Sequence, residues 1–230
     1  MSPVTSHSKR TGKPTTPLRQ RRSDRRCAIM QAAERLCRDR RFHEVTMDDI
    51  AAEAGVAKGT LYGYFPDKEE LFFQTIAAGI EDLCRVLDKK VSAAMAFPAQ
   101  LTDTCRRVSE FYHKRRTLLG MIQTEDARLS RCTGAHHQRW LTLRKKLQSA
   151  LAGVMAEGVA SGNLRRDSSP LVLASILMGM LRARAHDMME LDPALRSDEM
   201  IANLFLHGAG PCRPHRDTND FSRRQKSLPA

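Results

Sequence analysis

The chain has 230 residues, of which 41% are hydrophobic and 28% are charged, so it can bury a core and is not a wholly disordered polymer. Its 38 Lys and Arg residues outnumber the 26 Asp and Glu residues, and the formal net charge of +12 indicates a polyanionic partner, either nucleic acid or an anionic membrane. Most of this excess lies in residues 1–26 and 211–230, so the case for nucleic-acid binding by the folded part depends on a motif.

Membrane-spanning and secreted classes are excluded by the apolar segments and the cysteines. The longest strongly apolar run, residues 171–181, is well short of the ~20 residues that a membrane helix needs. The N-terminus is basic but has no apolar stretch of the kind found in secretory signals. The cysteines form no C-x-x-C pair and have no regular spacing, so we expect no metal site, no disulfide framework and a reducing cytoplasm; they are Cys27, Cys37, Cys84, Cys105, Cys132 and Cys212. We also expect no cofactor.

The spacing of apolar residues predicts an all-α fold. Long stretches without proline carry apolar residues every three or four positions, and no run alternates as a strand does. The ends of the chain, residues 1–24 and 211–230, are polar and charged and are expected to be disordered. Helices are predicted near residues 25–41, 46–54, 58–65, 67–95, 99–114, 117–131, 136–161, 170–190 and 194–208.

The second predicted helix has strong start and stop signals. Thr46 is the expected N-cap, and Asp49 follows three residues later as in a capping box. Val45 and Ile50 occupy the positions of a hydrophobic staple. Gly55 ends the helix, because glycine adopts the left-handed conformation after a helix without steric cost.

The third predicted helix, residues 58–65, follows this glycine turn and completes a helix-turn-helix unit. Leu61 and Phe65 are four residues apart and are expected to face inward. In such units the second helix of the pair lies in the major groove and presents its outward residues to DNA. The outward or marginal residues are Lys58, Gly59, Thr60, Tyr62, Gly63 and Tyr64.

These residue types suit contacts with DNA. Lys58 can bind phosphate or the acceptor edge of guanine, and Thr60 can donate to phosphate or contact a thymine methyl group. Tyr62 and Tyr64 supply long hydroxyls for backbone oxygens. Asp48 repels DNA electrostatically, and we interpret it as a residue that stabilises the helix start.

The segment TMDDIAAEAGVAKGTLYGYFPDKEELF resembles the N-terminal domain of the tetracycline-repressor (TetR) family of bacterial transcriptional regulators, and the resemblance covers residues 25–76. Two positions depart from the family pattern. Ala57 replaces a common serine N-cap, which loosens the third helix by ~1 kcal/mol, and Gly63 leaves one base-reading position empty. The resemblance implies DNA contacts, mostly with phosphates, by Thr46, Lys58, Gly59, Thr60, Tyr62, Tyr64 and Lys68.

The resemblance also implies the layout of the rest of the chain. Together with the polar composition of the two ends, it predicts a disordered basic arm (1–24), a helix-turn-helix DNA-binding domain (25–70), a helical effector-binding and dimerisation domain (71–210) and a disordered tail (211–230). The last two helices have broad apolar faces that would form a four-helix dimer interface, unless they are buried within one subunit. These faces carry Leu171, Leu173, Ile176, Leu177, Met180 and Leu181, followed by Ile201, Leu204 and Phe205.

Three kinds of candidate effector site remain in this second domain. Cys132 and His136 have a spacing that lets two helical side chains share a metal, but with no third ligand we expect a surface pair. Cys84 and Cys105 would sense oxidants only if they were accessible. Large, soft side chains would line a pocket for an apolar molecule, or else belong to the ordinary core; they are Phe111, Tyr112, Met121, Trp140, Met155 and Met178.

We therefore predict a cytoplasmic, homodimeric transcriptional regulator, a repressor that an apolar small molecule releases from an inverted-repeat operator in double-stranded DNA. The alternatives within the same fold are an activator, a thiol-responsive regulator or one whose second domain only dimerises. An enzyme is disfavoured because the sequence contains no G-x-S-x-G, P-loop or H-E-x-x-H motif. A membrane-surface protein that depends on its basic ends is the remaining alternative.

Overall fold

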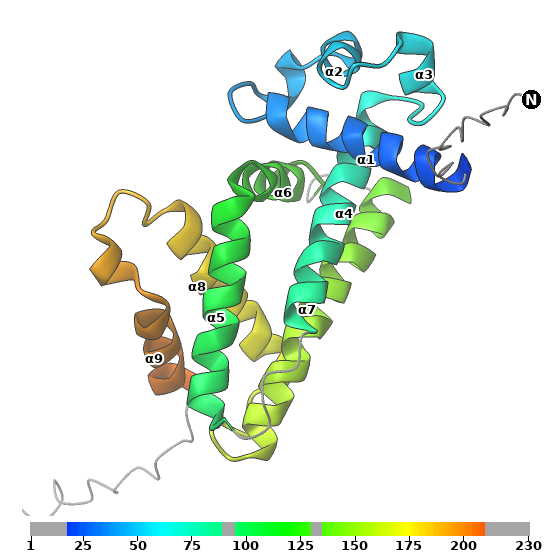
Figure 1. Ribbon diagram of the computed structural model, residues 1–230. Helices are drawn as coiled ribbons and strands as arrows, with labels where there is room; N and C mark the ends of the chain where they lie inside the picture. Colours follow the sequence, from blue (N-terminus) through cyan, green and yellow to red (C-terminus); the bar gives the residue numbers. More distant parts are fainter. Residues whose placement is uncertain (1–17, 89–94, 130–134, 210–230) are drawn as a thin grey trace, which may run out of the picture. The chain divides into compact units, whose positions relative to one another are not determined.

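The structure is a computed structural model that describes residues 18–88, 95–129 and 135–209 (Figure 1). These ranges contain helices, turns and loops but no strand, so the predicted all-α class is confirmed. The helices are α1 (Leu18–Leu36), η1 (Phe42–Glu44), α2 (Met47–Glu53), α3 (Lys58–Tyr62), α4 (Lys68–Leu87), α5 (Phe97–Lys114), α6 (Arg116–Leu129), α7 (Ala135–Ala160), α8 (Pro170–His186), η2 (Pro193–Arg196) and α9 (Asp198–Ala209).

The chain folds into two compact units that meet within α4, between Ala78 and Gly79. The first unit contains α1, α2, α3 and the beginning of α4. One apolar core joins these helices, because each of them buries aliphatic or aromatic side chains completely or almost completely. Its members include Ile29, Ala33, Val45, Ile50, Leu61, Phe65, Leu71 and Ile76.

The start and end of α2 agree with the prediction from the sequence. The Thr46 hydroxyl accepts a hydrogen bond from the Asp49 amide at 3.1 Å, and the Asp49 carboxylate accepts one from the Thr46 amide at 2.9 Å. The bond from the Thr46 backbone is the main reason that the pKa of Asp49 lies below its usual value. After the helix, Gly55 has a φ of +64°, so the predicted capping box and left-handed turn are both confirmed.

Two helices in the first unit differ from the prediction. Helix α1 begins at Leu18 and ends at Leu36, whereas the sequence predicted a helix from Arg25 to Arg41. Part of the expected disordered arm, residues 18–24, is therefore helical, and Gln20 donates a hydrogen bond to Asp24 one turn later at 2.8 Å. Residues 1–17 and the predicted tail lie outside the described residues. Helix α3 ends at Tyr62, and Gly63 is its C-cap, because glycine is a poor helix former.

The second unit contains the end of α4 and helices α5 to α9. Within it α7 packs along α8, and α5 packs along α9 (Figure 1). Gly79 of α4 lies against the buried side chain of Leu118 of α6, and a methyl group at Gly79 would overlap that leucine. The core of this unit includes Leu83, Leu101, Val108, Leu118, Leu151, Met155, Leu177 and Phe205.

The helices of the second unit follow the predicted order, with differences at their ends. Helix α7 ends before Gly162, whose φ of +74° confirms the predicted glycine stop. Ser169 caps α8 by accepting a hydrogen bond from the Val172 amide at 3.3 Å. The last predicted helix is divided, because Pro193 starts a short 3₁₀ turn and α9 begins only at Asp198. Among the described helices, none is long and apolar enough to cross a membrane.

Candidate nucleic-acid interface and ligand pocket

Helix α3 is anchored in the core by Leu61 and, just beyond the end of the helix, by Phe65, and other residues of the helix are exposed. Leu61 and Phe65 are 0% accessible, as predicted from their spacing. Tyr62 is 45% exposed, Lys58 is exposed and Thr60 is half-buried. A short helix that is anchored on one side and polar on the other is the arrangement that a groove-reading helix requires.

Small residues stand at the N-terminal end of α3. Ala57 is the N-cap and makes no side-chain hydrogen bond, as expected from its residue type. Gly59 has no atom within 4 Å of the position that a Cβ would occupy, so packing does not require a glycine here. A flat surface of this kind lets a partner approach the helix backbone closely.

Lys58 forms an exposed ion pair with Asp48 of α2. The ammonium nitrogen lies 2.9 Å from Oδ2 and 2.8 Å from Oδ1 of the carboxylate. Hydrogen bonding to Asp48 is the main reason that the pKa of Lys58 is raised above its ordinary value. Lys58 is therefore charged at neutral pH, and an approaching phosphate must compete with Asp48 for it.

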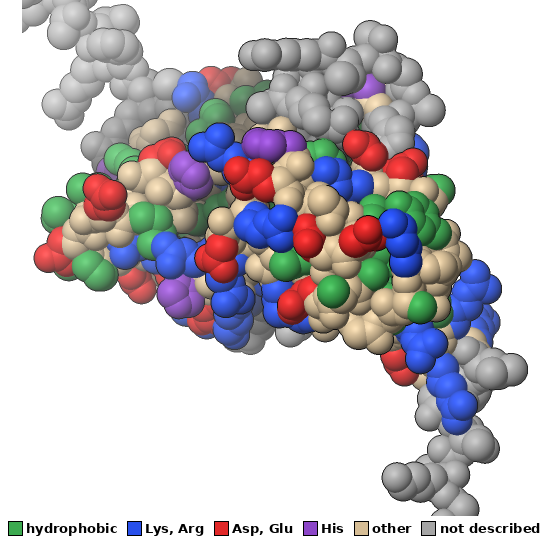
Figure 2. Space-filling view, turned by 90° about the horizontal axis from the view of Figure 1, so that it is seen from above, with side chains coloured by type: hydrophobic (Ala, Val, Ile, Leu, Met, Phe, Trp, Pro, Cys, Tyr) green, Lys and Arg blue, Asp and Glu red, His purple; other side chains and the backbone are tan. Residues whose placement is uncertain are grey.

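Arginines of α1 lie beside the segment that follows α3. The Arg22 guanidinium lies 5.9 Å from the ring centroid of Tyr64, and that of Arg26 lies 5.6 Å from the ring centroid of Phe65. Arg26 also donates a hydrogen bond to Gln74. Figure 2 shows basic side chains gathered at the end where the described chain begins, and the exposed arginines there are Arg19, Arg21, Arg22, Arg25 and Arg26.

Two further residues implied by the resemblance make contacts inside the first unit. The Thr46 hydroxyl accepts the capping bond of α2, although its own proton remains available for donation. The Lys68 ammonium donates to the carbonyl oxygens of Phe42 and Val45 at 3.0 and 3.1 Å. It also lies 4.4 Å from the ring centroid of Phe42. Lys68 thus fixes the loop before α2. Its contact with a DNA phosphate remains a prediction.

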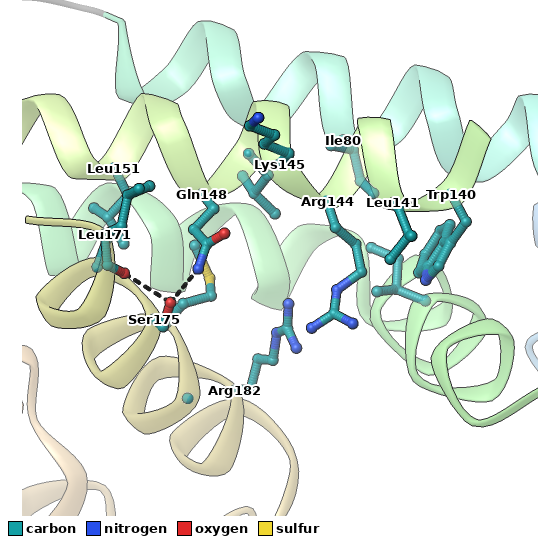
Figure 3. Close-up of a pocket in the computed structure, with 15 residues that line it drawn as sticks. Ile80, Trp140, Leu141, Arg144, Lys145, Gln148, Leu151, Leu171, Ser175 and Arg182 are labelled. Atoms are coloured by element: carbon teal, nitrogen blue, oxygen red, sulfur yellow. Dashed lines mark hydrogen bonds between the residues drawn. The ribbon is translucent and has the colours of Figure 1, made fainter. Parts of the chain in front are cut away.

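A pocket of about 430 Å³ opens in the second unit (Figure 3). Helices α4, α6, α7 and α8 line it. Its volume lies within the range of roughly 300 to 1,000 Å³ that is typical of small-molecule sites. Most of its wall is apolar and is formed by Ile80, Ile122, Trp140, Leu141, Leu147, Leu151, Leu171, Ala174 and Met178.

The polar side chains of this pocket come from α7 and α8. Gln148 donates a hydrogen bond to Ser175, which donates in turn to the carbonyl oxygen of Leu171 at 2.7 Å. The charged residues are Arg144 and Lys145 on α7 and Arg182 on α8, and none of the described lining residues is acidic. The pocket therefore combines an apolar wall with positive charge.

Two of the six residues predicted for an effector pocket line this one, namely Trp140 and Met178. Tyr112 lies behind it, where its hydroxyl donates to the Met178 sulfur at 3.3 Å and is hydrogen-bonded to Arg182. Phe111, Met121 and Met155 do not line the pocket, and Met155 is completely buried. The three basic residues were not predicted, because lysines and arginines on helices usually belong to the solvated surface.

The apolar faces of α8 and α9 are divided between core and surface. Within one chain, Leu173, Leu177 and Leu181 are buried, as are Ile201 and Phe205. Other large apolar side chains of the same helices are 51 to 60% exposed, namely Val172, Ile176 and Leu204, while Leu171, which is 44% exposed, lines the pocket. The buried side chains agree with the expectation that these helices pack within one subunit. The exposed side chains form an apolar face that a partner could cover.

The cysteines and histidines give little support to metal or thiol chemistry. No group of three His, Cys, Asp or Glu residues that could hold a metal occurs among the described residues. The predicted Cys132 and His136 pair lies outside the described side chains. Burial raises the pKa of Cys105 to about 12 and also raises that of Cys84, so neither thiol forms a reactive thiolate readily.

Comparison with known proteins relates the first unit to bacterial regulators. Residues 29–75 match the sequence profile of the family described as bacterial regulatory proteins, tetR family. The chain is 24% identical over 184 residues to the uncharacterized HTH-type transcriptional regulator YhgD of Bacillus subtilis, covering 80% of this chain and 94% of YhgD. It is 33% identical over 95 residues to the HTH-type transcriptional regulator EthR of Mycolicibacterium smegmatis, covering 41% of this chain and 44% of EthR.

Solved structures share the fold of the chain at low sequence identity. The fatty acid degradation regulator FadR of Bacillus halodurans has a TM-score of 0.68 and 18% identity, covering 85% of this chain and 98% of FadR. The transcriptional regulator FadR of Bacillus subtilis, in complex with stearoyl-CoA, has a TM-score of 0.63 and 19% identity, covering 79% of this chain and 95% of FadR.

Proposed function

We propose that this chain, a DNA-binding transcriptional regulator of the tetR family, is a homodimeric repressor that a small-molecule effector releases from its operator. The observation that carries this proposal is α3, which exposes Lys58 and Tyr62 while Leu61 anchors it in the core. Since such regulators act on bacterial genes, we place the protein in the cytoplasm. Enzymatic activity is not part of the proposal.

The proposed DNA contacts come from three places in the first unit. Lys58, Thr60 and Tyr62 of α3 enter the major groove, where Gly59 allows close approach of the backbone. Thr46 and Tyr64 flank this helix and bind phosphates. Arg22 and Arg26 of α1 add positive charge beside Tyr64 and Phe65. Lys68 supports this surface by holding the loop that precedes Thr46.

The homodimer is proposed to form through the exposed faces of α8 and α9. Val172, Ile176 and Leu204 are too exposed to contribute fully to the core of one chain, and a symmetric copy of the same face would bury them. A two-fold dimer presents two copies of α3, which must lie about 34 to 36 Å apart to enter successive major grooves. The operator is therefore expected to be an inverted repeat.

Selection of bound duplexes from a random double-stranded DNA library tests this function directly. We expect the recovered sequences to share an inverted repeat whose half-site centres are about 10 base pairs apart or a multiple of that distance. The α3 residues read the half-sites, so the strongest base preferences should lie in the centres of the halves. Recovery of no preferred sequence would contradict the proposal, and a single unrepeated site would contradict the dimer.

Asp48→Asn is expected to strengthen operator binding by about twofold to fivefold, because it releases Lys58 from its ion pair and removes a negative charge beside the DNA. Fluorescence anisotropy with labelled operator at several salt concentrations measures the change. Glu53→Gln is the matched control, since Glu53 is also on α2 but pairs with Arg35 of α1. Equal effects of the two substitutions would show that the Lys58 ion pair has no specific influence.

The effector is proposed to bind in the pocket between α7 and α8. Its volume and apolar wall suit a small molecule, and the Bacillus subtilis FadR of similar fold was solved with stearoyl-CoA bound. The pocket favours a ligand-responsive regulator over one whose second domain only dimerises. The raised pKa values of Cys84 and Cys105 speak against a thiol-responsive one.

A further inference from the structure

We propose that the pocket between α7 and α8 binds an anionic amphiphile, a molecule with one apolar chain and a carboxylate or phosphate head group. This inference rests on the proposed function, since it names the chemical class of the effector. It differs from the expectation of a purely apolar ligand, because the side chains that line the pocket include three cations.

Apolar side chains at both ends of the pocket can contact the hydrocarbon chain of the ligand. Ile80 of α4 and Ile122 of α6 are almost completely buried, and Trp140 is 2% exposed even though it lines the pocket. Leu151 and Leu171 extend the apolar wall at the other end of the pocket, beyond Gln148 (Figure 3). A small hydrophilic anion would leave this surface in contact with water, so the wall favours a ligand with a hydrocarbon part.

The anionic head is accommodated by arginines that come from two different helices. Figure 3 shows Arg144 of α7 and Arg182 of α8 extending into the same space, between Trp140 and Gln148. Lys145 adds a third positive charge, and no described lining residue supplies a carboxylate. Guanidinium groups bind carboxylates and phosphates through charge-assisted, often paired hydrogen bonds, so these two side chains suit an anionic head group.

Arg182 is also held in position from behind. Tyr112, which is 2% exposed, is hydrogen-bonded to Arg182, and its hydroxyl lies 3.3 Å from the sulfur of Met178. A solvated surface arginine has no such support from a buried hydroxyl. Arg182 therefore loses less side-chain conformational entropy when an anion binds, which is the property of a preorganised site.

Binding of three matched probes to the full chain tests the proposed ligand class. Dodecanoate and dodecyl phosphate carry the two kinds of anionic head, and 1-dodecanol has a chain of the same length without a charge. Trp140 is the only tryptophan in the sequence and lines the pocket, so its fluorescence reports occupancy. We expect at least one anionic probe to bind about tenfold or more tightly than the alcohol. Preference for dodecanoate identifies a carboxylate head, and preference for dodecyl phosphate identifies a phosphate head.

Two arginine substitutions and one control locate the binding site. Arg144→Gln and Arg182→Gln should each lower the affinity for the anionic probe about tenfold and leave the affinity for 1-dodecanol unchanged. Arg139→Gln is the control, because Arg139 is exposed on α7 but does not line the pocket. If removing the Tyr112 partner unfolds the Arg182 variant, the Arg144 variant still tests the prediction. Equal binding of the alcohol and both anions, or unchanged anion binding by the Arg144 variant, would overturn the inference.

These measurements need no DNA, so they separate the ligand class from the proposed function. A chain that binds operator DNA but none of the anionic probes better than 1-dodecanol contradicts the ligand class alone. If the chain binds dodecanoate through Arg144 but selects no DNA sequence, the result supports the ligand class and contradicts the proposed function.

Discussion

Lys58→Ala and Tyr62→Ala should each weaken operator binding by roughly 5 to 150 fold, the loss expected when one specific contact with a base or phosphate is removed. Both side chains are exposed on α3, whereas Leu61 of the same helix is completely buried. Neither side chain belongs to the buried core of the first unit, so their removal should take away contacts with DNA and, for Lys58, the ion pair with Asp48. Anisotropy titrations with the selected operator, at one fixed salt concentration, measure both effects.

The controls for these variants test folding and simple loss of charge separately. Circular dichroism should give the same helix content for both variants as for the parent chain. Lys114→Ala removes an equivalent exposed charge from the end of α5 in the second unit and should leave operator affinity nearly unchanged. If both α3 variants keep full affinity, the assignment of α3 as the groove-reading helix is wrong.

The helix-turn-helix unit was predictable because its signals are local. The capping box of Thr46 and Asp49 and the left-handed Gly55 depend on a few neighbouring residues, so the sequence specifies them almost completely. The inward direction of Leu61 and Phe65 follows from the helical repeat. The same logic gave the order of the helices in the second unit and the glycine stop at Gly162.

The beginning of α1 was not predicted, because two physical effects oppose each other there. High positive charge and nearby prolines favour disorder, whereas arginine and glutamine are good helix formers. Residues after Pro17 contain no further helix breaker, and the helix extends back to Leu18. This brings Arg22 close to Tyr64, a contact between residues 42 positions apart that local sequence signals do not contain.

The ligand pocket depends on contacts between helices that are distant in the sequence. Large apolar residues form both cores and pockets, and their type alone does not distinguish the completely buried Met155 from the pocket residue Trp140. The basic residues that line the pocket are even harder to predict from the sequence. Arg144 and Arg182 look like ordinary surface arginines until α7 and α8 are packed together.

A bound effector would contact the helix that belongs to both units. Ile80 of α4 lines the pocket, and its neighbour Gly79 packs against Leu118 of α6. Ile122, one turn further along α6, lines the pocket too. Because interfaces packed this closely shift between discrete arrangements, a ligand that displaces Ile80 or Ile122 would change the position of α4. Helix α4 begins at Lys68, which holds the loop before α2, so the change reaches the DNA-binding unit through one helix.

Effector and operator should therefore weaken each other's binding by the same factor. An inducer must bind the arrangement that is incompetent for DNA more tightly, and a typical coupling free energy of ~1 to 3 kcal/mol lowers operator affinity by roughly 5 to 150 fold. Thermodynamic linkage then requires saturating operator DNA to reduce the affinity for the anionic probe, followed by Trp140 fluorescence, to the same extent. Arg144→Gln is the control, since it should lose the response to the probe and keep operator affinity. If the affinity for the probe is identical with and without operator, the pocket is not coupled to DNA binding and the inducer mechanism is wrong.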